Sequence, residues 1–263
     1  MKIAILYICT GKYHIFFKDF YESCERYFIE KAQKQYFVFT DNEDLITNNA
    51  RTEGVRTYYK KCEGFPMDSL FRFDQFLRVK EELKDFDYAY FFNSNMLFVA
   101  PIDEEFLPSS DSFTALVHPG YNNRPSWIYP YERNKKSRAY ISPYNGPYTY
   151  YMGSLNGGSV SSFIKFAEVC SKNVHEDYDD GIIAVFHDES HLNHYMKITN
   201  GKAIPSHYVC AEGSPDTDKA KIIIRDKTKY DKYFTKGHSY SAREIIINAI
   251  NRVWRAFRWY LFI

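Results

Sequence analysis

In the first third of the chain, short continuous apolar runs alternate with more polar stretches. In some of these stretches apolar residues recur at the spacing of a helix. The runs at residues 3–9 and 35–41 predict two buried strands, and aromatic residues recur at helical spacing between residues 16 and 28. A strand, a helix and a second strand, each strand ending in a polar residue, indicate a doubly wound α/β sheet. Ligands of such sheets collect beyond the carboxyl ends of the strands, so we expect Thr10 and Asp41 to lie near a ligand.

The pattern continues with another strand and a longer helix. Residues 55–59 predict a short strand, and residues 69–83 predict a helix with Asp68 as its N-cap. Arg72 lies on this helix between apolar positions. Its guanidinium is either a solvated helix charge or a clamp on a ligand, depending on which way the helix faces.

A polar interruption follows the predicted central strand. Residues 88–92 are apolar or aromatic throughout and end in Asn93-Ser94-Asn95, before a further apolar run at residues 96–99. Polar residues between two buried runs indicate a site, because burying them without a task is costly. A plain Asn-rich turn would also explain the interruption.

Groups that can bond, titrate or ligate gather at residues 187–193, directly after the core-like apolar run 182–186. If the segment is helical, His187 and His191 lie one turn apart on one face with His194 nearby, which is a possible zinc geometry. Alternatively, Asp188 and Glu189 form a carboxylate pair at a polar cleft. A third interpretation is a helix N-terminus whose acidic residues complement the helix dipole.

Composition narrows the class of protein. The 263 residues suit one large domain, or one domain with an appendage. A net charge of +1 gives no reason to expect a nucleic-acid partner. Five cysteines without a CxxC pair favour reduced thiols in a cytoplasmic setting. The high tyrosine content suits sugar and uracil rings, although packing at interfaces would explain it equally well.

Six motifs together closely resemble family 6 of the retaining glycosyltransferases, which includes the histo-blood-group A and B transferases and bacterial relatives. They lie in family order at residues 36–41, 118–121, 131–133, 150–153, 157–160 and 187–193. The resemblance spans about residues 5–227 and makes the zinc interpretation unattractive. It implies the GT-A fold, a single Rossmann-like nucleotide-sugar-binding domain with a mixed central sheet.

The resemblance also implies roles for individual residues. Uracil is held by the first strand and its turn, here Ile8, Cys9, Thr10 and Tyr13. Arg72 and Asp188 match positions that hold donor sugar hydroxyls. Glu189 matches the carboxylate beneath the anomeric carbon, which is either the nucleophile of a double displacement or a stabiliser of an oxocarbenium-like ion attacked from the front. His118 and Glu189 match positions that contact the acceptor.

The family's metal-binding Asp-x-Asp is replaced by two amides. Neutral Asn93 and Asn95 would be weak ligands for a divalent cation, so we expect donor binding without Mn²⁺ or Mg²⁺ and no metal site. Both amides can still bond ribose or phosphate. The pyrophosphate charge then needs other cations, and the candidates are Arg225 and Lys227, with Arg133 in reserve. A solvated charged run is the alternative for the first two.

Two further departures concern specificity. Phe186 stands where mammalian members have Trp, and near Tyr208 the expected Trp-Asp is replaced by Cys210-Ala211 with Glu212 following. Both positions face the acceptor in the family, so the acceptor of the relatives does not transfer to this chain.

Donor choice in the family depends on the positions of Met152 and Ser154. Ser154 is larger than the Gly that leaves room for an acetamido group, which favours UDP-galactose. Its hydroxyl could instead bond the acetamide of UDP-N-acetylgalactosamine.

The C-terminal residues differ in character from the rest. Residues 227–240 are a polar connector, and Ser241 is placed to cap an amphipathic helix over residues 242–263. Charges interrupt this helix too often for a membrane span, but it suits the plane of an anionic leaflet. Packing on the domain or on a partner is the alternative. We therefore expect a catalytic domain at residues 1–240 and a helical appendage at residues 241–263.

Together these features predict a retaining α-1,3-galactosyltransferase or α-1,3-N-acetylgalactosaminyltransferase. It would transfer the sugar from UDP to a fucosylated galactoside of a surface glycan, either free or linked to a lipid. We expect it in the cytoplasm or on the inner face of the cytoplasmic membrane. A sugar-nucleotide-binding protein without turnover is the rival hypothesis.

Overall fold

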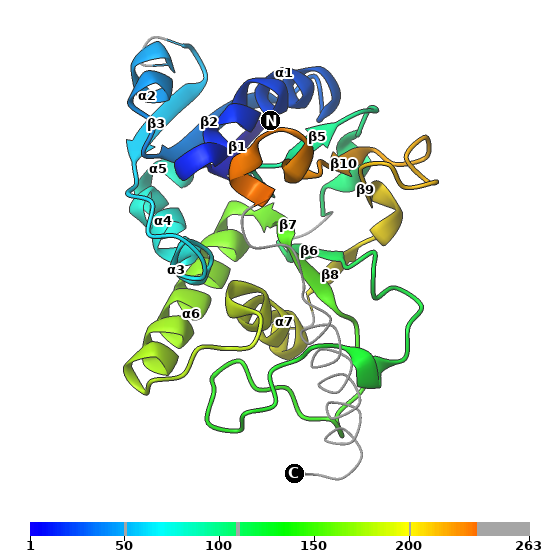
Figure 1. Cartoon of the computed structure of the whole chain (residues 1–263). Helices are drawn as coiled ribbons and strands as arrows, with labels where there is room; N and C mark the ends of the chain where they lie inside the picture. Colours follow the sequence, from blue (N-terminus) through cyan, green and yellow to red (C-terminus); the bar gives the residue numbers. More distant parts are fainter. Residues whose placement is uncertain (50–51, 109–110, 200, 236–263) are drawn as a thin grey trace.

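The computed structural model describes residues 1–49, 52–108, 111–199 and 201–235. Its centre is a seven-stranded mixed sheet flanked by helices on both faces (Figure 1). The strands, in spatial order, are β3 (Val55–Tyr59), β2 (Gln33–Thr40), β1 (Lys2–Ile8), β4 (Tyr88–Asn93), β7 (Tyr151–Ser159), β6 (Phe113–Val117) and β8 (Lys202–Ile204). The first four are parallel, β7 runs antiparallel to β4 and β6, and β8 is parallel to β6. The predicted mixed α/β fold of the GT-A type is therefore confirmed.

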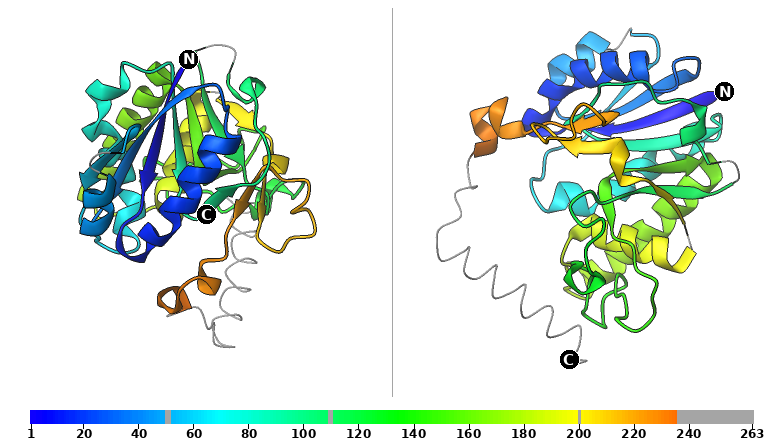
Figure 2. Two further views of the ribbon diagram at one scale, coloured as in Figure 1. Left: turned by 90° about the horizontal axis from the view of Figure 1, so that it is seen from above. Right: turned by 90° about the vertical axis from the view of Figure 1, so that its right-hand side faces the viewer.

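A smaller three-stranded sheet lies beside the main one. It consists of β5 (Met96–Phe98), β10 (Ile222–Ile224) and β9 (Val209–Ala211), so it joins the middle of the chain to its last described segments. The 3-10 helices η5 (Lys227–Lys229) and η6 (Lys232–Thr235) follow β10 and pack beside Tyr13, on the side of the molecule away from the N-terminus in the views of Figure 2. Other 3-10 helices are η1 (Gly11–Phe16), η2 (Glu104–Phe106), η3 (Ser126–Ile128) and η4 (Ser206–Tyr208).

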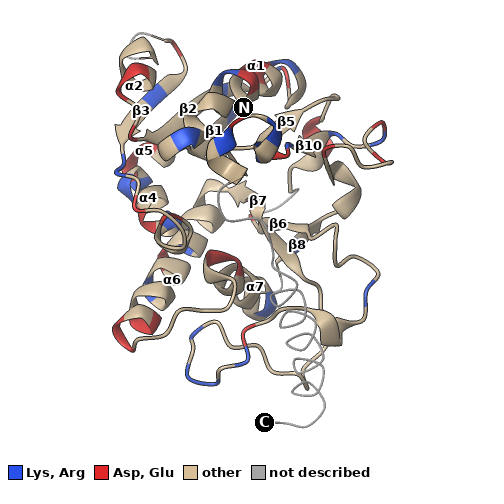
Figure 3. Ribbon diagram, viewed as in Figure 1, with Lys and Arg blue, Asp and Glu red and all other residues tan. Residues whose placement is uncertain are grey.

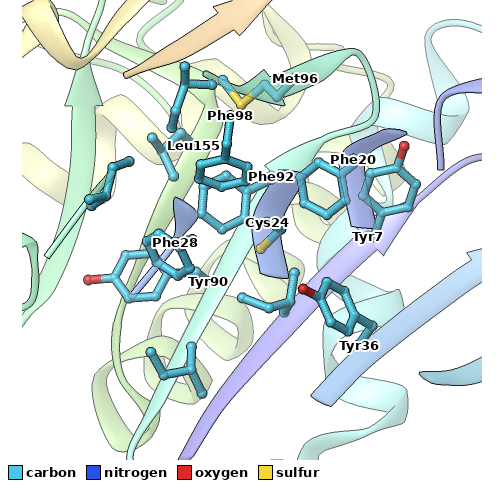
Figure 4. Close-up of a cluster of buried hydrophobic side chains, with 14 of the residues drawn as sticks. Tyr7, Phe20, Cys24, Phe28, Tyr36, Tyr90, Phe92, Met96, Phe98 and Leu155 are labelled. Carbon is cyan, nitrogen blue, oxygen red and sulfur yellow. The ribbon is translucent and has the colours of Figure 1, made fainter. Parts of the chain in front are cut away.

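Alternate residues of β1 face two separate hydrophobic cores, which explains why the whole run is apolar. Ile5 and Tyr7 pack on the side of α1 (Phe17–Tyr27), and Figure 4 shows Tyr7 among the aromatic side chains of this core. Ala4 and Leu6 pack on the opposite side, where α6 (Val160–Asp179) and α7 (His187–Thr199) cover the sheet. A strand buried on both faces shows no polar alternation. This position fixes the carboxyl end of β1 in the middle of the molecule.

The helix predicted over residues 69–83 is interrupted twice. It consists of α3 (Met67–Leu70), α4 (Arg72–Arg78) and α5 (Lys80–Leu83), with breaks at Phe71 and Val79. The Phe71 ring packs against Tyr178 of α6, a tertiary contact that helical periodicity does not report. The N-cap prediction for Asp68 is wrong, because Pro66 takes that position and Asp68 lies inside α3. The remaining helix, α2 (Glu43–Asn49), precedes β3.

The apolar run at residues 182–186 is not a core segment. It connects α6 to α7, and the side chains of Ile183, Val185 and Phe186 are 45%, 46% and 38% exposed. Apolar composition alone does not establish burial, since much of any protein surface is apolar. The expectation of a buried run before α7 is therefore wrong.

The predicted C-terminal helix at 242–263, and the domain boundary at residue 240, lie outside the described residues. Within the part of the chain that is described, no helix has both the length and the apolar character needed to cross a bilayer.

Candidate active site

Two adjoining cavities open at the carboxyl ends of β1 and β4. The first has a volume of about 690 Å³ and the second about 450 Å³. Phe65, Ser69, Arg72 and Asn93 line both of them. The two cavities therefore form one cleft with two ends, at the sheet edge where a doubly wound fold binds its ligands.

The first cavity is walled by the start and the end of the described chain. Ile8, Thr10 and Tyr13 line one wall, and Lys227, Tyr233 and Phe234 line another. The rings of Tyr13 and Phe234 meet edge to face, with centroids 4.8 Å apart. Aromatic and polar groups are thus arranged around a space large enough for a nucleotide.

Cys9 does not line this cavity, although it lies between two residues that do. Its side chain is fully buried, and burial raises the pKa of its thiol to about 12. Its backbone N–H donates to the Phe39 carbonyl, and its own carbonyl accepts from the Thr40 hydroxyl. Cys9 therefore supports the cavity floor and is not brought to the cavity itself.

Lys227 is placed at the cavity wall as the sequence predicts. Its ammonium donates to the Tyr13 hydroxyl at 2.6 Å and lies 5.0 Å from the centroid of the Tyr13 ring. An ammonium group has three N–H donors, so it can also bond a second, anionic acceptor. Lys227 is the cation of the predicted pair that faces this space.

Arg225 is oriented differently. Its buried guanidinium pairs with Asp19 at 2.7 Å, donates to the Phe16 carbonyl at 3.1 Å and stacks over the Phe16 ring. It does not line either cavity. Arg133, the reserve candidate, donates to the Ile141 carbonyl and also lies away from both cavities. The structure therefore does not bring either arginine to the place where we expected it.

The two asparagines of the Asn-x-Asn motif contact each other, since Asn93 Nδ2 donates to Asn95 Oδ1 at 3.4 Å, but only one of them lines the cleft. Asn93 lines both cavities. Asn95 is buried, and its side-chain N–H donates to the backbone carbonyl of Arg225 at 2.8 Å. The backbone carbonyl of Asn95 accepts from the backbone N–H of Arg225. Asn95 thus holds β10 against β5, and only Asn93 of the pair is directed at the cleft.

The second cavity contains the carboxylate pair. Asp188 and Glu189 lie in the first turn of α7, where Figure 3 shows acidic positions near the centre of the molecule. Asp188 is paired with Arg72 at 3.1 Å, and Arg72 also donates to the Gly153 carbonyl at 3.2 Å. The Arg72 guanidinium lies over the Phe91 ring, so this residue faces the cleft and is not a solvated helix charge.

Glu189 is held at both carboxylate oxygens. The Tyr150 hydroxyl donates to Oε1 at 2.6 Å, and the Gly153 N–H donates to Oε2 at 2.8 Å. A Cβ at position 153 would lie 2.9 Å from Asp188 Oδ2, so glycine permits the close approach of β7 to α7. These bonds leave the carboxylate group fixed at the cavity wall.

Burial dominates the protonation of both acids. It raises the pKa of Asp188 to about 6, against the opposing effect of Arg72. It raises the pKa of Glu189 to about 7, against the hydrogen bonds from Tyr150 and Gly153. Perturbed carboxyl groups that line a cleft mark a functional site, and this pair can serve as base, nucleophile or electrostatic stabiliser near neutral pH.

The helical prediction for residues 187–194 is correct, but the zinc interpretation is not. His187 meets the Phe65 ring, His194 contacts the Tyr140 carbonyl, and His191 is buried 3.7 Å from Asp177. No three His, Cys, Asp or Glu side chains gather as a metal-binding group anywhere in the described ranges.

Residues predicted for donor choice and acceptor contact are divided between two regions. Met152, Ser154 and Phe186 line the second cavity. His118 lines neither cavity; its ring centroid lies 5.8 Å from that of Tyr150, and burial lowers its pKa. Glu212 is elsewhere: its carboxylate accepts from the Asp226 N–H beside Lys229. The structure does not place Glu212 at the cleft.

Sequence reasoning missed several residues that line the cleft or support its wall. Phe65 is 80% exposed and lines both cavities, and Tyr233 and Phe234 complete the first. Glu132 accepts from the Val185 N–H at 2.8 Å and so fixes the segment that leads into α7. Of these residues, only Glu132 was indicated by the sequence, because it belongs to the Tyr-Glu-Arg motif at residues 131–133.

Comparison with known proteins agrees with this geometry. The sequence model of glycosyltransferase family 6 matches residues 1–229. The chain belongs to glycosyltransferase family 6. The resemblance drawn from the motifs is therefore confirmed, and this family 6 protein is a glycosyltransferase.

Three relatives of this family 6 enzyme illustrate the range of similarity. The O-antigen biosynthesis glycosyltransferase WbnI of Escherichia coli is 37% identical over 233 residues, covering 89% of this chain and 98% of the relative. Globoside alpha-1,3-N-acetylgalactosaminyltransferase 1 of Gallus gallus is 30% identical over 229 residues, or 85% and 66% of the two chains. Histo-blood group ABO system transferase 2 of Rattus norvegicus is 30% identical over 203 residues, or 74% and 58%. The chain spans less than two thirds of the length of these two vertebrate relatives.

The raised pKa of Glu189 predicts a pH-dependent stability of this glycosyltransferase. A Glu carboxyl in the unfolded chain titrates near 4.5, whereas burial raises the native value to about 7. Between these values the unfolded chain has lost a proton that the native state keeps, so the free energy of unfolding falls as pH rises from about 4.5 to about 7. The difference amounts to about 3 kcal/mol.

Urea unfolding of the wild type and of Glu189→Gln at the two ends of this range measures the effect. Gln does not titrate, so the wild type is expected to lose about 3 kcal/mol more than the variant on going to the higher pH. Asp188 remains in both proteins, so the difference between them reports what Glu189 adds, including its repulsion with Asp188. Parallel losses in the two proteins would show that the pKa of Glu189 is not raised.

Proposed function

We propose that this family 6 glycosyltransferase transfers galactose or N-acetylgalactosamine from UDP, with retention, to the 3-hydroxyl of a galactoside in a surface glycan. The observation that carries the proposal is the position of Glu189. Its carboxylate lies at one end of a cleft whose other end has the size and lining for a nucleotide. A sugar joined to a nucleotide in the first cavity would reach Glu189 in the second.

Retention requires a group near the anomeric carbon on the face opposite the leaving phosphate, or a front-face attack assisted by that phosphate. Glu189 fits either role, because it is fixed at both oxygens and titrates near neutral pH. Asp188 and Arg72, paired beside it, are suited to bond the sugar hydroxyls. The names of the globoside relatives, which are alpha-1,3-N-acetylgalactosaminyltransferases, support an α-1,3 linkage for this proposal.

The donor sugar is proposed to be galactose. Ser154 lines the second cavity, and its Oγ has no hydrogen-bond partner among the described residues. Its bulk beside Met152 favours the sugar without an acetamido group. The unpartnered hydroxyl supports the alternative, since an N-acetyl oxygen could accept its hydrogen bond.

Binding of the pyrophosphate is proposed to proceed without a divalent cation. The donor set around the first cavity is unsuited to Mg²⁺ or Mn²⁺, because Asn93 is neutral and Asn95 is directed at the Arg225 carbonyl. The Asp68 carboxylate already accepts from Lys60, Glu63 and Gly64. Lys227 is then the cation best placed to bond the phosphates, as a charge-assisted donor.

The acceptor is proposed to be a fucosylated galactoside carried on a lipid or on a lipopolysaccharide precursor. The E. coli relative is named for O-antigen biosynthesis, which supports a surface glycan. Exposed Phe65, Val185 and Phe186 at the mouth of the second cavity offer apolar faces for a sugar ring. The rival hypothesis, a binding protein without turnover, does not account for the assembled trio of Arg72, Asp188 and Glu189.

The first test of this function is release of UDP from UDP-galactose and from UDP-N-acetylgalactosamine, with a fucosylated galactoside present. We expect the rate in EDTA to equal the rate with added Mn²⁺. We also expect UDP-galactose to react faster than UDP-N-acetylgalactosamine. Glu189→Gln should lower kcat by at least about 100-fold while UDP binding persists. Turnover only with Mn²⁺ would contradict the metal-free proposal, and wild-type rates in the Gln variant would remove Glu189 from the mechanism.

Lys227 provides a second test, with a matched control two residues away. Replacing it by Gln removes a charge-assisted bond to phosphate, so the Kd of UDP in EDTA should rise by about 10-fold or more. Lys229→Gln makes the same change at a residue that pairs with Glu212 and does not line the cleft. Calorimetric titration of both variants with UDP should show the loss only at position 227; equal affinities in the two would exclude Lys227 as the phosphate ligand.

A peripheral contact with an anionic leaflet, through a helix at residues 242–263, remains part of the proposal. It assigns the enzyme to the cytoplasm, at the inner face of the cytoplasmic membrane. A chain ending at Tyr240 should no longer sediment with vesicles of anionic lipid but should keep its UDP affinity. Unchanged sedimentation would show that the last residues have another role.

A further inference from the structure

Tyr150 stands apart from the tyrosines that surround it. Five tyrosines pack together with Ile141 in the long segment between β6 and β7, and we call them the tyrosine cluster: Tyr121, Tyr129, Tyr131, Tyr148 and Tyr150. Tyr150 is 2% exposed, and its ring lies 5.0 Å from that of Tyr121 and 5.4 Å from that of Tyr131. The ring is therefore held firmly by its neighbours.

The hydroxyl groups of this cluster have two kinds of acceptor. Those of Tyr129, Tyr131 and Tyr148 donate to backbone carbonyls of the same segment, at 3.0, 2.7 and 2.9 Å. The Tyr150 hydroxyl instead donates to Glu189 Oε1 at 2.6 Å, across to α7. A short bond of this kind, from a neutral donor to a carboxylate, is stronger than one between neutral groups.

We propose that Tyr150 is a positioning residue, which fixes the rotation of the Glu189 carboxylate and favours its charged form. The inference rests on the proposed function, in which Glu189 acts at the anomeric carbon. Gly153 N–H fixes Oε2, and Tyr150 is the second point that sets the plane of the carboxylate. With a single bond the terminal torsion of a Glu side chain is free to vary broadly.

The charges around Glu189 are consistent with this role. Asp188 opposes its ionisation and Arg72 favours it, and the hydrogen bonds from Tyr150 and Gly153 also favour the charged form against burial. The phenol of Tyr150 stays protonated, because burial and the neighbouring Glu189 raise its pKa far above the ordinary range. Tyr150 thus remains a donor at every pH at which the enzyme would be assayed. It lines neither cavity, so it acts through Glu189 and not on the substrate.

The change Tyr150→Phe keeps the ring and removes only the hydroxyl. In the full chain, kcat at neutral pH should fall by about 10- to 100-fold, and the acid limb of the kcat profile should move up by about one pH unit. The KM for the UDP-sugar should stay within about twofold, because ground-state binding does not involve Tyr150. A uniform loss at all pH values, with the limb unmoved, would mean a merely structural role and would overturn the proposal.

Tyr131→Phe is the matched control. It removes a hydroxyl from the same cluster, one that donates to the Thr149 carbonyl and does not touch Glu189. Its acid limb should coincide with that of the wild type. An equal shift in both variants would assign the effect to the cluster as a whole and would contradict a specific role for Tyr150.

A titration that needs no activity separates this inference from the proposed function. With ¹³C-labelled Glu carboxyl groups, the Glu189 signal is identified by its loss in Glu189→Gln, and its inflection should lie at higher pH in Tyr150→Phe. An unchanged inflection would refute the role of Tyr150 even in an active enzyme. Absence of transfer by the wild type with either donor would refute the proposed function, while the titration would still decide whether Tyr150 favours the charged form of Glu189.

Discussion

The site depends on the burial of two adjacent carboxyl groups at the start of α7. Removing such groups from water is costly, and burial raises the pKa of both Asp188 and Glu189. The cost is offset by specific partners: the guanidinium of Arg72 for one, and the donors of Tyr150 and Gly153 for the other. Each partner comes from a different element, so the helix α4, the strand β7 and the segment before it are all required to keep α7 in place.

The cleft follows from where the two halves of the chain meet. Parallel strands β1 and β4 bring their carboxyl ends to one edge of the sheet, and β7, antiparallel to β4, begins at that same edge. The first cavity is closed by residues from early and late segments of the described chain, since Tyr13 packs against Lys227 and Phe234. A site assembled in this way joins its two cavities through shared residues, among them Arg72 and Asn93.

The two amides of the Asn-x-Asn motif affect more than one property of the cleft. Asn95 is neutral and forms part of the hydrogen bonding that joins β5 to β10. That contact positions the chain just before Lys227, and the Arg225 guanidinium reinforces it through Asp19. Arg225, which we expected at the cleft, instead supports the segment that carries Lys227 to the wall of the first cavity.

The sequence by itself determined the fold class, the strands that flank the cleft and the carboxylate pair. These features are local, because a strand buried on both faces must be apolar throughout and because the family motifs are contiguous in the chain. Tertiary structure alone decided which cations face the cavity, that Asn95 is directed away from it and that Tyr150 donates to Glu189. Lys227 and Tyr13 are 214 positions apart, and no periodicity reports a contact of that range. The exposure of the apolar run before α7 was missed for the same reason. Composition records how apolar a segment is, whereas burial depends on what the rest of the chain packs against it.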